Sequence, residues 1–256
     1  MLIKITEKCS MECPHCMNNA TANGKEMELK TFIDTLNFIN KKELLNNTAI
    51  IITGGEPTEH SKFVEFMEIL ANFYKEEHII ALTTVTTNGF WCLENQEEAK
   101  RIISLFPVNS FIFQVSADIR YYPKRLDITK RIFREKGFVL CDDCVEVLYP
   151  QGRALQNFNN KCSAYASKCF NIRAISKQIS NPTLKDIISS LASINKFCTP
   201  HIKINGDIGL GESDLCPTCA SIYDEPKDIV EKIINFKCSQ CNHINDKLSP
   251  KYKQFL

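Results

Sequence analysis

The chain has 256 residues, of which 44% are apolar, and a formal net charge of +1 from 31 basic and 30 acidic side chains. This length allows one sizeable core, or one domain with a small appendage. Because the charges balance, they provide no strong field for nucleic acid or an anionic membrane, and we expect neither as a partner.

The chain also lacks the sequence features of export or membrane insertion. It has no run of roughly 18 apolar residues, which a membrane helix would need. Its start, Met-Leu-Ile-Lys-Ile, lacks the basic region and apolar stretch of a signal peptide. We therefore expect a cytoplasmic protein. The 13 cysteines are an odd number, and in such a chain they indicate metal ligands or redox groups rather than disulfides.

The first half of the chain alternates strand and helix patterns. This alternation is typical of βαβ units with a parallel sheet. In chain order we predict a strand over 2–6, a helix over 29–39, a strand over 49–52, a helix over 63–73, a strand over 79–85, a helix over 94–105, a strand over 110–116, a helix over 128–133 and a strand over 145–149.

The loop after the first strand carries three closely spaced cysteines, in the run Cys9-Ser-Met-Glu-Cys-Pro-His-Cys16. Three thiolates on one short loop can hold three irons of a four-iron cluster and leave the fourth iron open for chemistry. The same cysteines with His15 could instead bind a structural zinc ion.

Polar and glycine residues follow the later strands, at Gly54–Pro57, Thr87–Gly89, Ser116, Asp118 and Gly152–Arg153. Sites in parallel sheets lie at the carboxyl ends of the strands, so these groups are expected to converge. Each group also has a structural interpretation: a strand-to-helix turn, an Asn-Gly turn, a helix cap or a surface arginine.

The C-x3-C-x2-C loop, followed by Gly-Gly-Glu-Pro, resembles the signature of the radical S-adenosylmethionine (SAM) enzymes. The resemblance implies a partial (β/α)6 barrel over 1–180. It also implies a [4Fe-4S] cluster on Cys9, Cys13 and Cys16 that chelates SAM and cleaves it to a 5′-deoxyadenosyl radical. The residues expected to bind SAM are His15, Gly54, Gly55, Glu56, Pro57, Asn88, Ser116, Asp118 and Arg153.

The segment 181–256 is predicted to begin with a helix over 183–194 and to form a small cysteine-rich metal-binding domain. Its pattern C-x12-G-x4-C, then C-x2-C, resembles the twitch domain, a shortened relative of the SPASM domain. The resemblance implies an auxiliary [4Fe-4S] cluster on Cys198, Cys216, Cys238 and Cys241. Cys216 and Cys219 with Cys238 and Cys241 also have zinc-ribbon spacing, so zinc is the alternative.

Four further cysteines, Cys141, Cys144, Cys162 and Cys169, have no assigned role. They could hold a second auxiliary metal, donate hydrogen to a substrate radical, or be inert.

Twitch and SPASM relatives often modify ribosomally made peptides. We therefore expect an oxidoreductase or peptide maturase that crosslinks, epimerises or oxidises a peptide or protein, with an electron donor such as flavodoxin or ferredoxin. Because the barrel is predicted from residue 2, a leader-binding domain would have to be a separate protein. The alternatives are a radical SAM dehydrogenase of a small molecule and a non-enzymatic zinc-binding adaptor.

Overall fold

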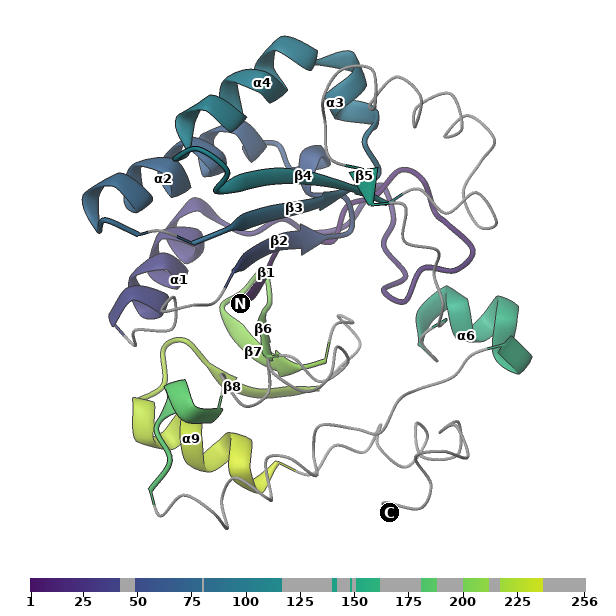
Figure 1. Ribbon diagram of the computed structural model, residues 1–256. Helices are drawn as coiled ribbons and strands as arrows, with labels where there is room; N and C mark the ends of the chain where they lie inside the picture. The colour runs from purple at the N-terminus through teal and green to yellow at the C-terminus, as the bar shows by residue number, and fades with distance from the viewer. Residues whose placement is uncertain are drawn as a thin grey trace.

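The computed structural model describes residues 1–41, 49–79, 81–116, 140–141, 148, 151–161, 181–187, 200–211 and 217–236. These residues form one sheet with the strand order β5-β4-β3-β2-β1-β6-β7-β8 (Figure 1). The elements are β1 Leu2–Thr6, α1 Leu29–Lys41, β2 Ile50–Gly54, η1 Pro57–Glu59, α2 Phe63–Glu76, β3 Thr83–Thr87, α3 Phe90–Glu94, α4 Gln96–Leu105, β4 Phe111–Ser116, β5 Leu140–Cys141, α6 Gly152–Phe158, η2 Asn159–Lys161, β6 Pro200–Ile202, β7 Asp207–Leu210, β8 Thr218–Ser221 and α9 Pro226–Asn235.

Strands β1 to β4 pair in parallel, as the alternating pattern predicts. Strands β5 and β6, which the sequence pattern did not predict, pair in parallel with β4 and β1. Leu2 of β1 is in register with Ile51 of β2, and Thr83 of β3 is in register with Phe111 of β4. Parallel pairing brings the carboxyl ends of these strands to one edge of the sheet. The loop that carries the three cysteines lies at this edge in Figure 1, next to α6. The prediction of an α/β fold with a parallel sheet is confirmed.

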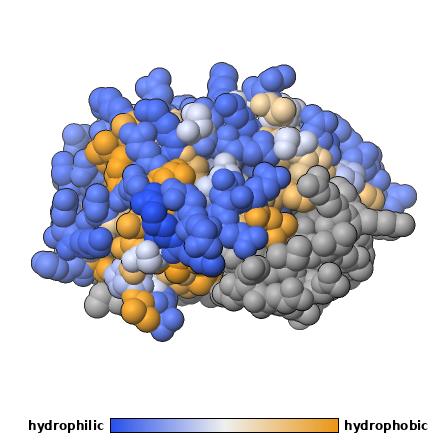
Figure 2. Space-filling view, turned by 90° about the horizontal axis from the view of Figure 1, so that it is seen from above, coloured by the Kyte–Doolittle hydropathy of each residue, from blue (hydrophilic) through white to orange (hydrophobic). Residues whose placement is uncertain are grey.

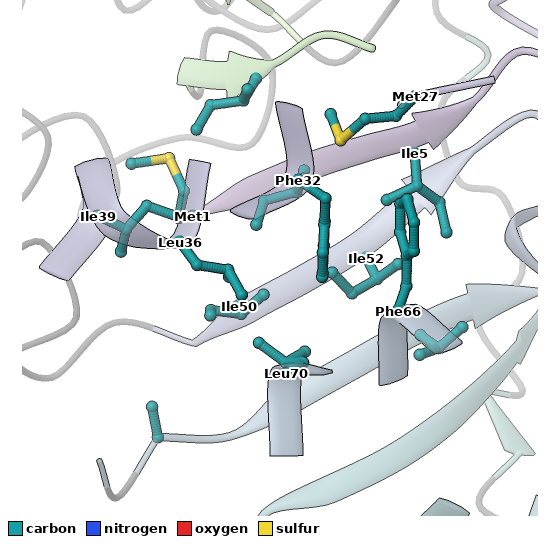
Figure 3. Packing of buried hydrophobic residues seen from close by; sticks show 14 of the residues in the cluster. Met1, Ile5, Met27, Phe32, Leu36, Ile39, Ile50, Ile52, Phe66 and Leu70 are labelled. Carbon is teal, nitrogen blue, oxygen red and sulfur yellow. The ribbon is translucent and has the colours of Figure 1, made fainter. Parts of the chain in front are cut away.

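The hydrophobic core lies between this sheet and the helices α1, α2 and α4 (Figure 1). Every second residue of β2 and of β4 is buried, because successive side chains of a strand point to opposite faces. Figure 3 shows Ile50 and Ile52 of β2 packed near Phe32, Phe66 and Leu70 of the helices.

The described C-terminal elements extend the same sheet. Strand β6 pairs in parallel with β1, and β7 and β8 follow it as antiparallel neighbours. Ile202, Ile208 and Ile233 belong to the same core cluster as Ile3 and Ile50. Apolar packing on the main core therefore contributes to the stability of a segment whose sequence suggested metal ligation. The boundary at residue 180 remains a prediction.

Several element boundaries differ by a few residues from their predicted positions, and two of these differences have a visible cause. Strand β3 begins at Thr83 rather than at Ile79, because Ile79 follows the end of α2 and donates its backbone N–H to the Tyr74 carbonyl of that helix. The helix predicted over 94–105 is preceded by α3. Asn95 separates the two helices with φ −124° and ψ 50°, and its side-chain amide donates to the Trp91 carbonyl.

The predicted helix over 128–133 lies outside the described residues, as does the strand over 145–149 apart from Leu148. Of the helix predicted over 183–194, residues 184–187 are described and are helical.

The face of the molecule seen in Figure 2 is mostly hydrophilic where the chain is described, with hydrophobic residues in small separate groups. Among the described residues, no helix is long and apolar enough to cross a membrane.

Candidate active site

A cavity of about 260 Å³ opens at the carboxyl ends of β1 to β4. Most of the predicted site residues converge on it. The following predicted residues line it: Cys9, Cys13, His15, Cys16, Gly54, Gly55, Glu56, Asn88, Ser116 and Arg153. Pro57 begins η1 beside the cavity. Asp118, Cys198, Cys216, Cys238 and Cys241 lie outside the described residues.

The cysteine loop turns tightly around the cavity. The backbone N–H of Cys16 donates to the Cys13 carbonyl at 3.1 Å, and Glu12 adopts a left-handed conformation with φ 47°. Cys9, Cys13 and Cys16 are all half-buried and outside disulfides. Burial raises the pKa of Cys9 to about 11 and that of Cys13 to about 12, and the other two cysteines also raise the pKa of Cys13. Three thiolates therefore need a compensating positive charge here, which iron would supply.

The three thiols line one cavity, as the ligands of a cluster would. In such a cluster each thiolate binds its own iron.

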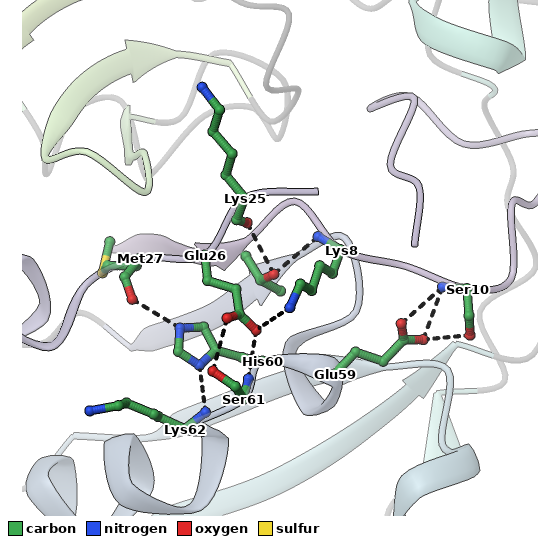
Figure 4. A network of polar contacts seen from close by, with 10 residues as sticks. Lys8, Ser10, Lys25, Glu26, Met27, Glu59, His60, Ser61 and Lys62 are labelled. Carbon is green, nitrogen blue, oxygen red and sulfur yellow. Dashed lines mark hydrogen bonds and ion pairs between the residues drawn. The ribbon is translucent and has the colours of Figure 1, made fainter. Parts of the chain in front are cut away.

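One side of the cysteine loop is anchored to η1 and the start of α2 (Figure 4). Ser10 donates its backbone N–H and its hydroxyl to Glu59, at 2.9 and 2.8 Å. Further along the loop, Glu26 accepts hydrogen bonds from the backbone and hydroxyl of Ser61 and pairs with Lys8 at 3.0 Å. These contacts link the loop to the residues that follow Gly-Gly-Glu-Pro.

Gly54 and Gly55 allow the end of β2 to lie directly against the loop. A Cβ atom on Gly55 would lie 2.2 Å from the Lys8 carbonyl oxygen, and one on Gly54 would lie 2.1 Å from that of Thr6. The approach is fixed by hydrogen bonds from the Gly55 N–H to the Thr6 carbonyl and from the Glu56 N–H to the Lys8 carbonyl. Any side chain at Gly54 or Gly55 would push these two backbones apart.

Glu56 is a buried carboxylate held by neutral donors. Its Oε1 accepts from the backbone N–H and hydroxyl of Thr58 and from the Thr87 hydroxyl, at 3.2, 2.7 and 2.6 Å. Its Oε2 accepts from the Asn88 N–H at 2.6 Å. Burial raises the pKa of this carboxyl, and these hydrogen bonds oppose the increase. Each carboxylate oxygen can accept about two hydrogen bonds, so Oε2 has room for one more. An ammonium group from a ligand would fit there.

Helix α6 anchors the other side of the cysteine loop. Arg153 donates from Nε to the Cys13 carbonyl and from Nη1 to the Ala20 carbonyl, both at 3.0 Å. The Ala154 N–H donates to the Cys16 carbonyl at 3.1 Å, and the Asn157 amide donates to the Pro14 carbonyl at 2.9 Å. The sequence singled out Arg153 but missed Asn157, which carries no local signal of this contact.

Comparison with known proteins identifies the family. A family model described as the radical SAM superfamily matches residues 3–138. The chain belongs to the radical SAM superfamily. Members of this family are enzymes that use SAM and a [4Fe-4S] cluster, and the three cysteines and the Glu56 carboxylate around one cavity fit both groups.

A curated relative, named GTP 3′,8-cyclase, from Alkaliphilus oremlandii (strain OhILAs), is 29% identical over 119 residues. The match covers 46% of this chain and 36% of the relative, so this chain aligns with about a third of that protein's length.

Two solved structures align with nearly the whole chain. The structure of native anSMEcpe with bound AdoMet (SAM) has a TM-score of 0.53 at 13% identity and covers 96% of this chain and 82% of that one. BtrN in complex with AdoMet and 2-DOIA has a TM-score of 0.46 at 14% identity and covers 99% and 84%. The anSMEcpe match supports the fold alone.

Proposed function

We propose that this radical SAM enzyme reductively cleaves SAM to methionine and a 5′-deoxyadenosyl radical, which abstracts hydrogen from a substrate. The observation that carries the proposal is the shared cavity. Three half-buried thiols and a buried carboxylate with neutral hydrogen-bond donors line one space at the carboxyl ends of the strands. When bound, the cluster supplies the electron that cleaves SAM.

The residues around the cavity bind and orient the two groups. Cys9, Cys13 and Cys16 are the expected cluster ligands, and Glu56 is placed to accept from the SAM ammonium through Oε2. Thr87 and Asn88 hold that carboxylate in one orientation, because they donate to different oxygens of it. The Glu56 carboxylate is thus already oriented before SAM binds. Its hydrogen-bond donors among the described residues are all neutral, so it keeps its negative charge for the SAM ammonium.

Metal analysis and a cleavage assay test this proposal. Protein purified without oxygen should contain iron and sulfide and should release 5′-deoxyadenosine when SAM and a reductant are added. Cys13→Ala should abolish the cleavage while the fold persists. Cys92→Ala, which changes a buried core cysteine outside the cavity, is the matched control and should retain cleavage. Cleavage retained by Cys13→Ala, or bound zinc without cleavage in the unmodified protein, would overturn the assignment.

We further propose an auxiliary [4Fe-4S] cluster on Cys198, Cys216, Cys238 and Cys241. Their spacing supports this ligand set, and so does the environment of Cys219. The Cys219 sulfur lies 3.1 Å from the Ile208 carbonyl oxygen of the neighbouring strand, which favours a structural role for that thiol. Cys216→Ala should remove about four irons, the content of one such cluster, and leave SAM cleavage intact. Loss of zinc instead would make the site structural.

The substrate is proposed at the level of class. The twitch-like spacing favours a ribosomally made peptide or protein, presented by a separate leader-binding partner, with a flavodoxin- or ferredoxin-type electron donor. The curated relative is named for a nucleotide reaction, which favours a small molecule as the second candidate. A substrate of either class should accelerate 5′-deoxyadenosine formation and, when deuterated at the reacting carbon, transfer deuterium into it. Transfer from a peptide but not from GTP would support the first candidate, and the reverse result the second.

A further inference from the structure

Helix α6 donates hydrogen bonds to four backbone carbonyls of the cysteine loop. Arg153 contacts the carbonyls of Cys13 and Ala20, Ala154 contacts that of Cys16, and Asn157 contacts that of Pro14. The contact is close, because a Cβ atom on Gly152 would lie 2.5 Å from the Met17 carbonyl oxygen. These carbonyls belong to the expected cluster ligands Cys13 and Cys16 or, except for that of Ala20, to residues next to them in the chain. The position of α6 therefore determines the shape of the loop.

Among the described residues, no hydrogen-bond acceptor of the Arg153 guanidinium neutralises the charge that it places at the cavity. Its two hydrogen-bonded acceptors are neutral carbonyl oxygens. Its third nitrogen, Nη2, is buried and has no hydrogen-bond partner among the described residues. The guanidinium lies within hydrogen-bond distance of the Cys13 carbonyl, so its positive charge favours negative charge on the cysteine loop.

We propose that Arg153 is a positioning residue for the cluster: it fixes the segment 13–20 through two carbonyl oxygens and presents a permanent positive charge that stabilises the reduced cluster. The inference rests on the proposed function. An electron from a ferredoxin- or flavodoxin-type donor adds one negative charge beside the guanidinium, with no accompanying proton. A fixed cation lowers the free energy of that added charge and so raises the reduction potential. Arg153 thus has a role toward the cluster, whereas its sequence context suggested a contact with SAM.

Hydrogen exchange on the iron-free protein tests the positioning role without any cluster. Arg153→Gln should speed amide exchange across residues 13–20 by about tenfold, because two hydrogen bonds to the loop are lost. Asn157→Ala, which removes a neutral contact from the same helix, should speed exchange near Pro14. Arg101→Gln is the control, because it removes an arginine that pairs with Glu68 and Glu98 on the surface. Unchanged exchange in Arg153→Gln would overturn the positioning role.

A redox titration of the reconstituted protein, followed by electron paramagnetic resonance, tests the role of the charge. Arg153→Gln should lower the reduction potential of the SAM-binding cluster. Arg153→Lys, which keeps the charge without the forked geometry, should restore much of it while exchange stays fast. Asn157→Ala and Arg101→Gln should leave the potential unchanged. An equal potential in Arg153→Gln and the unmodified protein would overturn the charge role. Failure of the unmodified protein to bind any cluster would instead overturn the proposed function, and the exchange measurement would still decide the positioning role.

Discussion

Glu56 has a carboxylate that is almost fully buried, with 2% of the residue exposed, and its four hydrogen bonds all come from neutral groups. Burying a charge without a cation is costly unless hydrogen bonds compensate for the lost water. The donors come from η1 and from the end of β3, so this one side chain ties two strand ends together. A ligand ammonium would lower the remaining cost.

Glu56→Gln should weaken both the fold and SAM binding. The amide nitrogen would face groups that themselves donate, so at least one buried hydrogen bond is lost. We expect the free energy of unfolding to fall by about 1–3 kcal/mol. SAM affinity should fall about tenfold or more, since the acceptor for the ammonium loses its charge. Urea denaturation and equilibrium binding of SAM measure the two effects. Glu65→Gln on the surface of α2 is the control, and full SAM affinity in Glu56→Gln would contradict the assigned role.

Glu26 should give the protein a stability that depends on pH. Burial alone would raise the pKa of this carboxyl, but hydrogen bonds from Ser61 and Lys8 outweigh burial and lower the pKa to about 2. In an unfolded chain a glutamate titrates near about 4.3. The lower folded pKa stabilises the protein above about pH 4.3, and this contribution is lost as the pH falls towards about 2.

Glu26→Gln should therefore lower the free energy of unfolding by about 1–2 kcal/mol at neutral pH. The difference from the unmodified protein should shrink progressively at acid pH. Urea denaturation at several pH values between neutral and about pH 3 measures this difference. A difference that stayed constant with pH would show that Glu26 contributes through packing rather than through its charge.

At the scale of elements, the cysteine loop is held between two partners on opposite sides. Ser10 and Glu26 connect it to η1 and the start of α2, and Arg153 and Asn157 connect it to α6. Glycines provide the close approach on each side, with Gly55 against the Lys8 carbonyl and Gly152 against that of Met17. The loop thus takes its shape from contacts with its neighbours.

Gly55→Ala should disturb the loop without touching a cysteine. Its Cβ would lie 2.2 Å from the Lys8 carbonyl oxygen, so the end of β2 and the loop must separate. We expect a loss of about 1–3 kcal/mol in the free energy of unfolding, together with incomplete iron loading. Asn37→Ala on the exposed face of α1 is the control. Full iron content and unchanged stability in Gly55→Ala would show that the loop can move aside.

At the scale of the whole molecule, one hydrophobic core joins the N-terminal and C-terminal strands. Ile202 and Ile208 belong to the same cluster as Ile3, and β6 completes the hydrogen bonding of β1. A segment whose sequence suggests a separate metal-binding unit therefore packs in the same core as the N-terminal strands. The two parts are expected to unfold together.

Ile233→Ala in α9 should lower the free energy of unfolding that is measured with a probe in the N-terminal half of the protein. Ile233 is 1% exposed, and truncation of such a side chain costs about 2–5 kcal/mol. The single tryptophan, Trp91, lies in α3 and packs against the same core. The urea concentration at the midpoint of the Trp91 fluorescence transition should fall in Ile233→Ala. It should stay nearly constant in Ile33→Ala, whose side chain is on the surface. A Trp91 transition insensitive to Ile233→Ala would mean that the two parts unfold independently.

Features that depend on near neighbours in the chain could be predicted well. The helical spacing of Phe32, Leu36 and Ile39 gave α1, and the spacing of Cys9, Cys13 and Cys16 gave the family and the expected cluster. The glycines before Glu56 marked a strand end with a close backbone approach. Each of these signals is contained in a short stretch of residues, where local geometry and side-chain chemistry decide the outcome.

Contacts between distant residues could not be predicted in this way. The partners of the Glu56 carboxylate include Thr87 and Asn88, and Arg153 contacts a carbonyl 140 residues earlier in the chain. The pairing of β6 with β1 likewise depends on how the chain closes upon itself. Short-range patterns thus predicted the fold class and the family and named the cysteines expected to react, whereas folding determined which groups hold those residues in place. The reason is that hydrogen bonds and packing across the sheet follow spatial proximity, which short-range patterns do not encode.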